Sequence, residues 1–389
     1  MQADLDLRQI GRFPALGCPL PPPGHPGPHP SRPAFLTGST PRRTPMIVLF
    51  PTYARRIAGG TRWRATVAGM VIRPLPATSR RRVLAMAVFR RLFDLDEEQL
   101  RQEVFRRRSD AFLFRRIPGA AVAVSIGGKV IEAGPTDRVG HFHLEIDLDD
   151  TTDPLAAPRT IAYDAWATEP AGDDGGETVS RGTGRVHLVD DEGLSVISDI
   201  DDTVKVTAVG NRRELLANTL LREFRAVPGM PEIYRGWEAD GAAFHYVSAS
   251  PWQLASCLDG FFTECGLPSG SMHLKLFRLK DSTPLGRFPS RKKSKRRVIE
   301  QIMADFPRRR FLLIGDSGER DPDVYTAVAR RKPAQVAGVV IRRVDGHGRP
   351  AWKLDRRLDR LARRLPRGLF QVFDEPDSIR DLGPGRAPA

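Results

Sequence analysis

Hydrophobic and polar residues follow two different patterns along the chain, and the change between them falls near residue 190. Before that point they alternate in short runs, for example at residues 122–126 and 142–148, and Gly127-Gly128 follows the first run. A period of two with glycine-rich turns is typical of antiparallel strands that bury one face. We therefore predict a smaller β-rich, sandwich-like domain at residues 46–190.

A helical pattern interrupts these strands at residues 80–116. Val83, Met86, Phe89 and Phe93 recur at helical spacing, and arginines occupy the other face. A basic amphipathic helix either covers one face of its own domain, which is the commoner role, or lies on an anionic bilayer. The pattern leaves both roles open.

Beyond residue 193 the chain changes to apolar runs separated by helical stripes. The runs lie at residues 196–197, 244–247, 311–314 and 336–341. This alternation predicts a parallel sheet that helices cover on both faces. We place this α/β domain at residues 194–345.

The two ends of the chain differ from both domains. Residues 1–45 contain eleven of the 33 prolines and almost no apolar periodicity, so we predict a disordered Pro-rich tail. Residues 346–389 place Leu354, Leu358 and Leu361 among arginines. We predict a helical C-terminal tail there, which either packs on the core or forms a further surface helix.

Composition and charge narrow the class of protein. Hydrophobic residues at 40% and charged residues at 28% are typical of an ordinary globular chain and exclude a mainly disordered or collagen-like one. The net charge of +14 has two explanations: an arginine-rich genome, or attraction to phosphate-bearing partners such as lipid headgroups or nucleic acid.

Cysteine usage and hydropathy bear on the compartment. Three scattered cysteines are too few for a disulfide framework or a zinc site, which favours a reducing compartment such as the cytoplasm. No stretch approaches the roughly 18 consecutive apolar residues of a membrane span. We therefore expect a cytoplasmic protein that meets a membrane, if at all, from its surface.

Acidic residues follow the first strand of the predicted parallel sheet. Asp199, Asp201 and Asp202 lie within four positions, and such carboxylates repel one another unless a cation such as Mg²⁺ sits among them. An exposed acidic turn is the plainer alternative. An EF-hand loop does not fit, because Val204 and Gly210 stand where it needs glycine and glutamate.

Two serines follow the second strand. Ser250 before Pro251 has the form of a helix N-cap, which explains it structurally. Ser248 lies at the strand end itself, where a hydroxyl near a helix N-terminus can hold a phosphoryl oxygen.

A last acidic group follows the strand at residues 311–314. Asp316 lies directly beyond that strand, where it would complete a metal site with Asp199. Asp321 before Pro322 can be an N-cap, a catalytic group or both. Upstream, Lys295 begins an amphipathic helix and can aim its ammonium at the same point, although its basic neighbours are also typical of a solvated or nucleic-acid-binding run.

Taken in order, these motifs resemble a known superfamily. Asp-x-Asp-x-Thr, a strand-end Ser, a helix-start Lys and Gly-Asp-x-x-x-x-Asp are similar to the four motifs of the haloacid dehalogenase (HAD) phosphotransferases. More narrowly, residues 199–203, 246–252 and 313–322 resemble the phosphatidate phosphatase family of the fungal actin-patch type. The resemblance covers about residues 194–345, and the β-rich region resembles that family's N-terminal domain more loosely. One departure is Ser294, where the family often has histidine.

The resemblance implies roles for the catalytic side chains. Asp199 would attack phosphorus and form an aspartyl-phosphate, and Asp201 would protonate the leaving alcohol and later activate water. Ser248 and Lys295 would stabilise the transferring phosphoryl oxygens.

The same resemblance implies a metal site. Mg²⁺ would be bound by Asp199, Asp316 and the main-chain carbonyl of Asp201, with Asp321 orienting Lys295 or the metal's water. The implied fold is a HAD-like parallel sheet with flanking helices.

Three hypotheses about function follow. The first is a Mg²⁺-dependent phosphatase that hydrolyses phosphatidate or a related lipid phosphate at the surface of an anionic membrane. The second is a soluble phosphomonoesterase that acts on nucleic-acid ends or small phosphate esters. The third is a binding module that has lost activity, which is the weakest because no motif position is missing.

Overall fold

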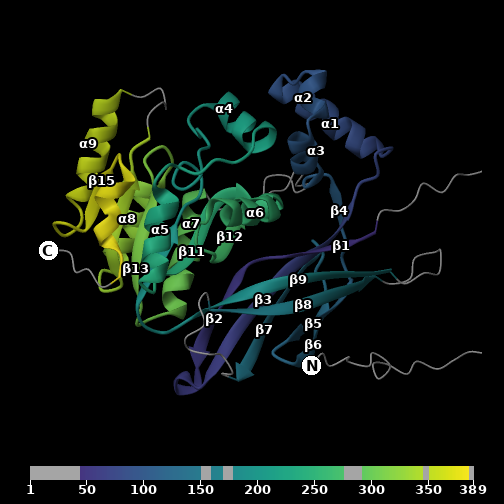
Figure 1. The fold of residues 1–389 in the computed structure, drawn as a ribbon, viewed down its shortest axis with the longest axis horizontal. Helices are drawn as coiled ribbons and strands as arrows, with labels where there is room; N and C mark the ends of the chain where they lie inside the picture. The colour runs from purple at the N-terminus through teal and green to yellow at the C-terminus, as the bar shows by residue number, and fades with distance from the viewer. Residues whose placement is uncertain (1–43, 150–158, 170–177, 276–290, 345–349, 385–389) are drawn as a thin grey trace, which may run out of the picture. The chain divides into compact units, whose positions relative to one another are not determined.

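The computed structural model describes residues 44–149, 159–169, 178–275, 291–344 and 350–384. Residues 1–43, nearly all of the predicted Pro-rich tail, lie outside them. Two sheets organise the described residues (Figure 1). None of the helices in these ranges is long and apolar enough to cross a bilayer.

The N-terminal sheet has nine strands among the described residues. They are β1 (Met46–Leu49), β2 (Thr52–Ile57), β3 (Arg62–Pro74), β4 (Phe114–Arg116), β5 (Ala121–Ile126), β6 (Lys129–Pro135), β7 (His141–Asp149), β8 (Thr160–Glu169) and β9 (Thr178–Val189). All neighbouring pairs are antiparallel except β2 and β9. The alternating runs of the sequence form β5 and β7, as predicted.

Alternation along these strands builds one apolar core. In β3, Trp63, Ala65 and Val67 are fully buried, whereas the residues between them are partly exposed. The sheet curls around this core, so that β6 approaches β7 and Lys129 Nζ lies 3.3 Å from an Asp149 carboxylate oxygen.

The helical pattern between β3 and β4 forms three short helices: α1 (Arg80–Phe93), α2 (Glu97–Arg101) and α3 (Glu103–Asp110). The chain leaves α1 at Asp94, which adopts a left-handed conformation with φ of 51°. It starts again at Asp96, whose side chain accepts a hydrogen bond from the Gln99 backbone N–H in a capping box. The predicted helical stretch is therefore broken by its own capping residues.

The second sheet has six strands, all parallel. They are β10 (Leu194–Ser198), β11 (Ala243–Pro251), β12 (Ser271–Lys275), β13 (Arg310–Asp316), β14 (Val336–Arg342) and β15 (Phe370–Phe373), in the order β12-β11-β10-β13-β14-β15. The structure is thus mixed α/β with a parallel sheet, as predicted.

Helices cover both faces of this parallel sheet (Figure 1). They are α5 (Met230–Ala239), α6 (Ala255–Cys265), α7 (Arg291–Asp305), α8 (Asp321–Arg331) and α9 (Ala351–Ala362). Two short helices, α4 (Arg212–Leu216) and the π-helix η3 (Ala217–Leu221), precede α5, and η3 packs on α3. Successive strand residues face opposite sides: Val196 joins a core with α5 and α6, and Ile197 joins a core with α7, α8 and α9. This explains why the strands read as continuous apolar runs.

Three features differ from the sequence pattern. The apolar stripe of Leu216, Leu220 and Phe224 predicts one helix that ends at Pro228-Gly229, but the helical segment ends at Leu221 and α5 begins directly after Gly229. The strands β12 and β15 were not predicted, because both are short and carry polar residues. Since β15 pairs with β14, residues 346–389 contribute a strand to the parallel sheet and are more than a helical tail.

Candidate active site

The predicted acidic groups meet where the parallel sheet reverses its strand order. From β10 the chain proceeds outward to β11 and β12, and then returns to β13 on the other side of β10. Such a switch point leaves a crevice at the carboxyl ends of the two central strands. Asp199 follows β10 and Asp316 ends β13, and the Asp199 N–H donates to the Ile314 carbonyl at 2.8 Å.

Three buried aspartates form a cluster in this crevice. One carboxylate oxygen each of Asp199, Asp316 and Asp321 lies within 4.8 Å of the other two. All three side chains are at most 1% exposed. Segments 117 residues apart in the chain, at Asp199 and Asp316, are therefore brought to one point.

A glycine lets the third carboxylate approach. A Cβ on Gly315 would lie 2.3 Å from Asp321 Oδ2 and 2.8 Å from the Tyr325 ring, closer than any real contact. A larger residue at position 315 would therefore displace the Asp321 carboxylate or the N-terminus of α8.

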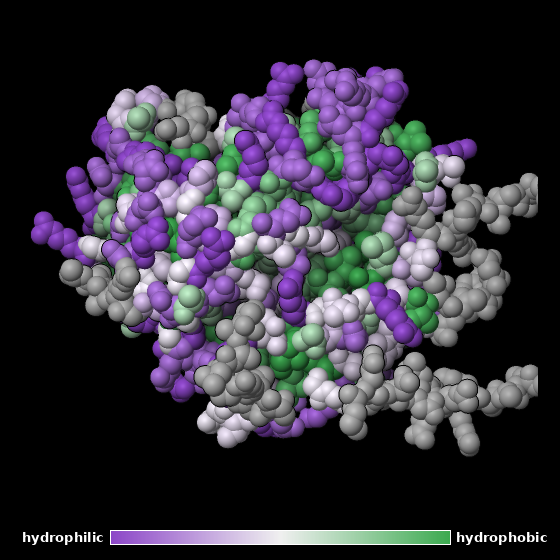
Figure 2. Space-filling view, viewed as in Figure 1, coloured by the Kyte–Doolittle hydropathy of each residue, from purple (hydrophilic) through white to green (hydrophobic). Residues whose placement is uncertain are grey.

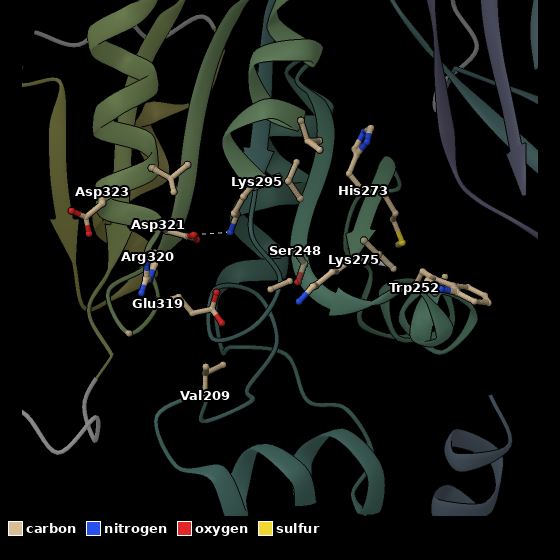
Figure 3. Close-up of a pocket in the computed structure, with 18 of the residues that line it drawn as sticks. Val209, Ser248, Trp252, His273, Lys275, Lys295, Glu319, Arg320, Asp321 and Asp323 are labelled. Atoms are coloured by element: carbon tan, nitrogen blue, oxygen red, sulfur yellow. Dashed lines mark hydrogen bonds and ion pairs between the residues drawn. The ribbon is translucent and has the colours of Figure 1, made fainter. Parts of the chain in front are cut away.

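Lys295 lies between two of these carboxylates. Its Nζ donates to Asp199 Oδ1 and to Asp321 Oδ1, both at 2.7 Å, and lies 5.6 Å from the Tyr325 ring centre. The ion pair with Asp321 is visible in Figure 3. Burial alone would lower the pKa of Lys295, but Asp199 and Asp321 outweigh it and raise that pKa well above its usual value.

One oxygen of each aspartate in the cluster lacks a protein partner. Within the described ranges, Oδ2 of Asp199, Asp316 and Asp321 is buried without a hydrogen bond. Asp316 Oδ1, by contrast, accepts from the Gly318 and Glu319 backbone N–H groups at 2.6 and 2.9 Å. Buried acceptors that are left unpaired are costly, so these three oxygens can accept a proton, a hydrogen-bond donor or a cation.

The charge balance of the cluster favours a cation. Burial raises the pKa of Asp199 and of Asp316 well above the usual aspartate value, and the neighbouring carboxylates add to the effect. Lys295 opposes it, but one ammonium faces three carboxylates. Oxygen donors of this kind suit a hard divalent cation, and Asp199, Asp316 and Asp321 are the residues that could hold it.

The carboxylate of Asp201 lies in a different network, although it is only two residues from Asp199. Its Oδ1 lies 2.8 Å from both Lys205 Nζ and Thr207 Oγ1. Its Oδ2 accepts from Ser250 Oγ at 2.5 Å and from Ser248 Oγ at 3.2 Å. The Asp201 carboxylate is therefore not part of the three-aspartate cluster.

This network fixes the charge of Asp201. Burial alone would raise the pKa of Asp201, but the Lys205 ammonium and the hydroxyl donors outweigh burial and bring that pKa to about 2. Asp201 is thus a carboxylate at neutral pH, held by four donors.

Two of the N-caps expected from the sequence are not formed. Because β11 runs on to Pro251, Ser250 lies within a strand and donates to Asp201 instead of capping a helix. Asp321 is the first residue of α8, whose N-cap is Arg320, and its carboxylate binds Lys295. Both residues have a polar partner that the local pattern does not show.

The loop after β10 is held by residues that sequence reasoning missed. Asp202 adopts a left-handed conformation with φ of 55°, and its carboxylate accepts from the backbone N–H groups of residues 207–209. Arg342 donates to the Asp202 carbonyl at 2.8 Å. Lys205, between two valines, was the signal available: a buried lysine needs a carboxylate partner.

A cavity of about 750 Å³ opens beside the cluster. Ser248, Lys295 and Asp321 line its polar end (Figure 3). Its opposite wall is apolar and includes Phe50, Val247, Trp252, Met272 and Leu274. The cavity is therefore amphipathic, with apolar and charged side chains in its lining, and Lys275 lies beside Ser248 (Figure 3).

Aromatic packing fixes this apolar wall. Trp252 lies edge-on between Phe50 and Phe114, with ring centres 5.8 and 5.4 Å apart. Because Phe50 and Phe114 belong to the N-terminal segment, both sheets contribute to the environment of the cavity.

Comparisons with known proteins match the segment of the chain that carries this site. Residues 194–343 match the family described as phosphatidate phosphatase APP1, catalytic domain. The chain is 29% identical over 252 residues to phosphatidate phosphatase APP1 of Saccharomyces cerevisiae, covering 62% of this chain and 41% of the yeast protein. It is 35% identical over 163 residues to an uncharacterized protein of Schizosaccharomyces pombe, covering 41% of this chain and 26% of that protein. The chain thus spans less than half the length of both relatives.

Structural likeness adds little to the sequence match. A crystal structure of a proposed HAD-like phosphatase from Mesorhizobium loti aligns with 46% of this chain and 90% of its own at 14% identity, with a TM-score of 0.28. That likeness is too weak to define the fold. The similarity to a known family therefore depends on the sequence comparisons. The sequence comparisons thus show that residues 194–343 are similar to the catalytic domain of phosphatidate phosphatase APP1.

Proposed function

We propose that the protein is a Mg²⁺-dependent phosphatase that hydrolyses phosphatidate or a related lipid phosphate through an aspartyl-phosphate intermediate. One observation carries the proposal: Asp199, Asp316 and Asp321 are buried together with unpartnered oxygens beside Lys295. Phosphoryl transfer needs this concentration of positioned charge more than it needs covalent chemistry from the protein.

Asp199 is the proposed nucleophile. Its free oxygen forms the bond to phosphorus while the bond from phosphorus to the ester oxygen breaks, and the departing alkoxide takes a proton. Lys295 holds the other oxygen of Asp199 and, with Ser248, faces the phosphoryl oxygens in the cavity. When Mg²⁺ is bound, its charge offsets the repulsion between the carboxylates and the phosphate.

Asp201 is the proposed acid and base. The donors that hold its pKa at about 2 also make it a weak base, so they must move away before Asp201 activates water in the second step. To act as the acid in the first step, Asp201 must exchange its contacts with Lys205 and Ser250 for the substrate oxygen, which removes the donors that keep it ionised.

The cavity favours a lipid substrate over a soluble one. Apolar side chains of Phe50, Trp252 and Leu274 extend from the polar end that holds Lys295. A phosphate joined to an apolar body would bury its tail against this wall, at about 25 cal/mol per Å² of apolar surface. A small phosphate ester would leave the wall in contact with water.

The alternative is a phosphomonoesterase for nucleic-acid ends or small esters, which the net charge of +14 favours. The first proposal includes contact with an anionic membrane surface, because its substrate resides in a bilayer. It also includes a cytoplasmic location. The absence of a membrane-crossing helix from the described residues is compatible with either.

One experiment separates the two. The protein is incubated with Mg²⁺ and either phosphatidate liposomes or a 5′-phosphorylated oligonucleotide, and released phosphate and diacylglycerol are measured. We expect diacylglycerol from the liposomes and little phosphate from the oligonucleotide. Phosphate release from the oligonucleotide alone would establish the alternative, and release from neither would contradict both.

A further inference from the structure

The outward face of helix α1 carries a group of exposed hydrophobic side chains. Val83, Leu84 and Val88 are 60%, 67% and 44% exposed. Single exposed hydrophobic residues are ordinary on protein surfaces. Three of them within two turns of one helix form a patch, and a patch of this kind marks an interaction site.

The other face of α1 is already used for packing. Ala85 and Met86 contact a small core that includes Leu75, Leu95 and Phe105. The helix is therefore fixed to the protein through one side, so its outward hydrophobic residues cannot turn inward without losing that packing.

Arginines flank the hydrophobic patch along the helix. Arg80 and Arg81 lie in the first turn and Arg90 and Arg91 in the last, and all four are exposed. Within the described ranges, none of the four is ion-paired. Figure 2 shows hydrophobic side chains beside strongly hydrophilic ones over the surface formed by α1 to α3.

We propose that α1 docks the protein on an anionic lipid surface. An apolar middle with cationic ends, on a helix of 14 residues, matches a flat bilayer whose acyl region and headgroups lie at different depths. Each arginine near such a surface strengthens binding about fivefold. The docking needs no turnover and so goes beyond the proposed phosphatase activity.

The acidic residues near α1 indicate which of its arginines contribute most to binding an anionic lipid surface. Asp94, Asp96, Glu97 and Glu98 follow the C-terminal end of α1 and reduce the local potential there. At the first turn the acidic neighbour is Asp110, whose charge Arg82 already neutralises in an ion pair at 2.5 Å. We therefore assign the main electrostatic contact to Arg80 and Arg81.

Vesicle flotation tests the proposal. Wild-type protein is mixed with vesicles of phosphatidylcholine alone or with phosphatidylserine, neither of which carries a phosphomonoester. We expect binding only to the anionic vesicles, with a loss on raising the salt concentration. Leu84→Asp should weaken binding at least tenfold, and Arg80→Gln with Arg81→Gln about 25-fold, following the fivefold effect of each arginine.

Val130→Asp is the matched control. Val130 is 57% exposed on β6, so it places the same charge at an equally accessible hydrophobic position outside α1. Wild-type protein that fails to float, or equal losses for Leu84→Asp and Val130→Asp, would overturn the proposal. Circular dichroism verifies that each variant is folded.

Activity on a soluble phosphomonoester is measured in parallel. That substrate reports on the active site alone, so unchanged turnover in Leu84→Asp shows that the lost flotation is a docking defect. Phosphate release from phosphatidate liposomes by the wild type is measured as well. If the wild type floats but releases no phosphate from those liposomes, the phosphatase proposal fails and the docking proposal stands.

Discussion

Asp199 and Asp201 are two residues apart and have opposite environments. Asp201 is surrounded by four donors, and its pKa falls to about 2. Asp199 has one oxygen on Lys295 and another without a partner among the described residues, and burial raises its pKa. The difference indicates that Asp199 has an acceptor oxygen free for chemistry, whereas Asp201 holds the loop and must first release its donors before it can act as the proposed acid.

The lysines show the same contrast. Lys205 is buried and pairs with a single carboxylate, that of Asp201. Lys295 pairs with Asp199 and Asp321 and faces Asp316 as well. The charges of Lys205 and Asp201 thus balance within the protein, whereas Lys295 faces more carboxylates than it can neutralise.

The largest expected effect comes from removing the proposed nucleophile. Asp199→Asn should lower kcat by a factor on the order of 10⁴ or more, because an amide cannot form the bond to phosphorus. The fold should survive, since burial disfavours the charge that the substitution removes. Phosphate release from phosphatidate liposomes and circular dichroism measure the two quantities.

Asp240→Asn is the control for Asp199→Asn, because Asp240 is exposed at the end of α5. It should retain wild-type turnover. If Asp199→Asn also retains it, the assignment of the nucleophile is wrong.

The next largest effect concerns the balanced pair. Lys205→Met keeps the hydrocarbon stem but leaves the buried Asp201 carboxylate without its counter-ion. Breaking such a pair costs about 3–5 kcal/mol of unfolding free energy. Urea unfolding should show this loss with and without Mg²⁺ to the same extent. If Mg²⁺ restores the lost stability, the Asp201 network and the three-aspartate cluster are not separate.

Lys295→Met should behave differently. It leaves Asp199, Asp316 and Asp321 with no cation, so the unfolding free energy in EDTA should fall by roughly 2 kcal/mol, on the scale of an unpaired buried group. Millimolar Mg²⁺ should restore most of it, because a bound ion stabilises the folded state by mass action. Thermal unfolding in EDTA and in Mg²⁺ tests this, and a shift that is the same in both would contradict a metal site at the cluster.

The sequence predicted the three-aspartate cluster beside Lys295 better than the network around Asp201. Asp199 and Asp316 follow apolar runs, and parallel strands end at the same edge of a sheet, so their proximity could be inferred. Lys295 lies in the second turn of α7, not at its start as expected, and the apolar stripe of that helix fixes the orientation of Lys295 toward the sheet. Each of these residues thus has a periodic pattern beside it that places it.

The network around Asp201 depends on local backbone geometry instead. Ser250-Pro251 has the form of an N-cap, but the pairing of β11 with β12 shifts register between Val247 and Pro251, and the strand continues past the serine. Thr207 directly precedes Ala208, whose positive φ of 58° marks an irregular turn that no periodic pattern describes. Contacts set by such irregular backbone cannot be read from spacing.

The smallest stability effect separates the two serines on Asp201. Ser250→Ala removes a 2.5 Å hydrogen bond to a carboxylate and should lower the unfolding free energy by about 2 kcal/mol. Ser248 donates over a longer 3.2 Å and lines the cavity, so Ser248→Ala should cost less stability but lower kcat about 100-fold if it contacts the phosphoryl group. Urea unfolding and phosphate release on both variants test this reciprocal pattern. Equal effects of the two substitutions on both quantities would show that one hydroxyl network serves structure and catalysis alike.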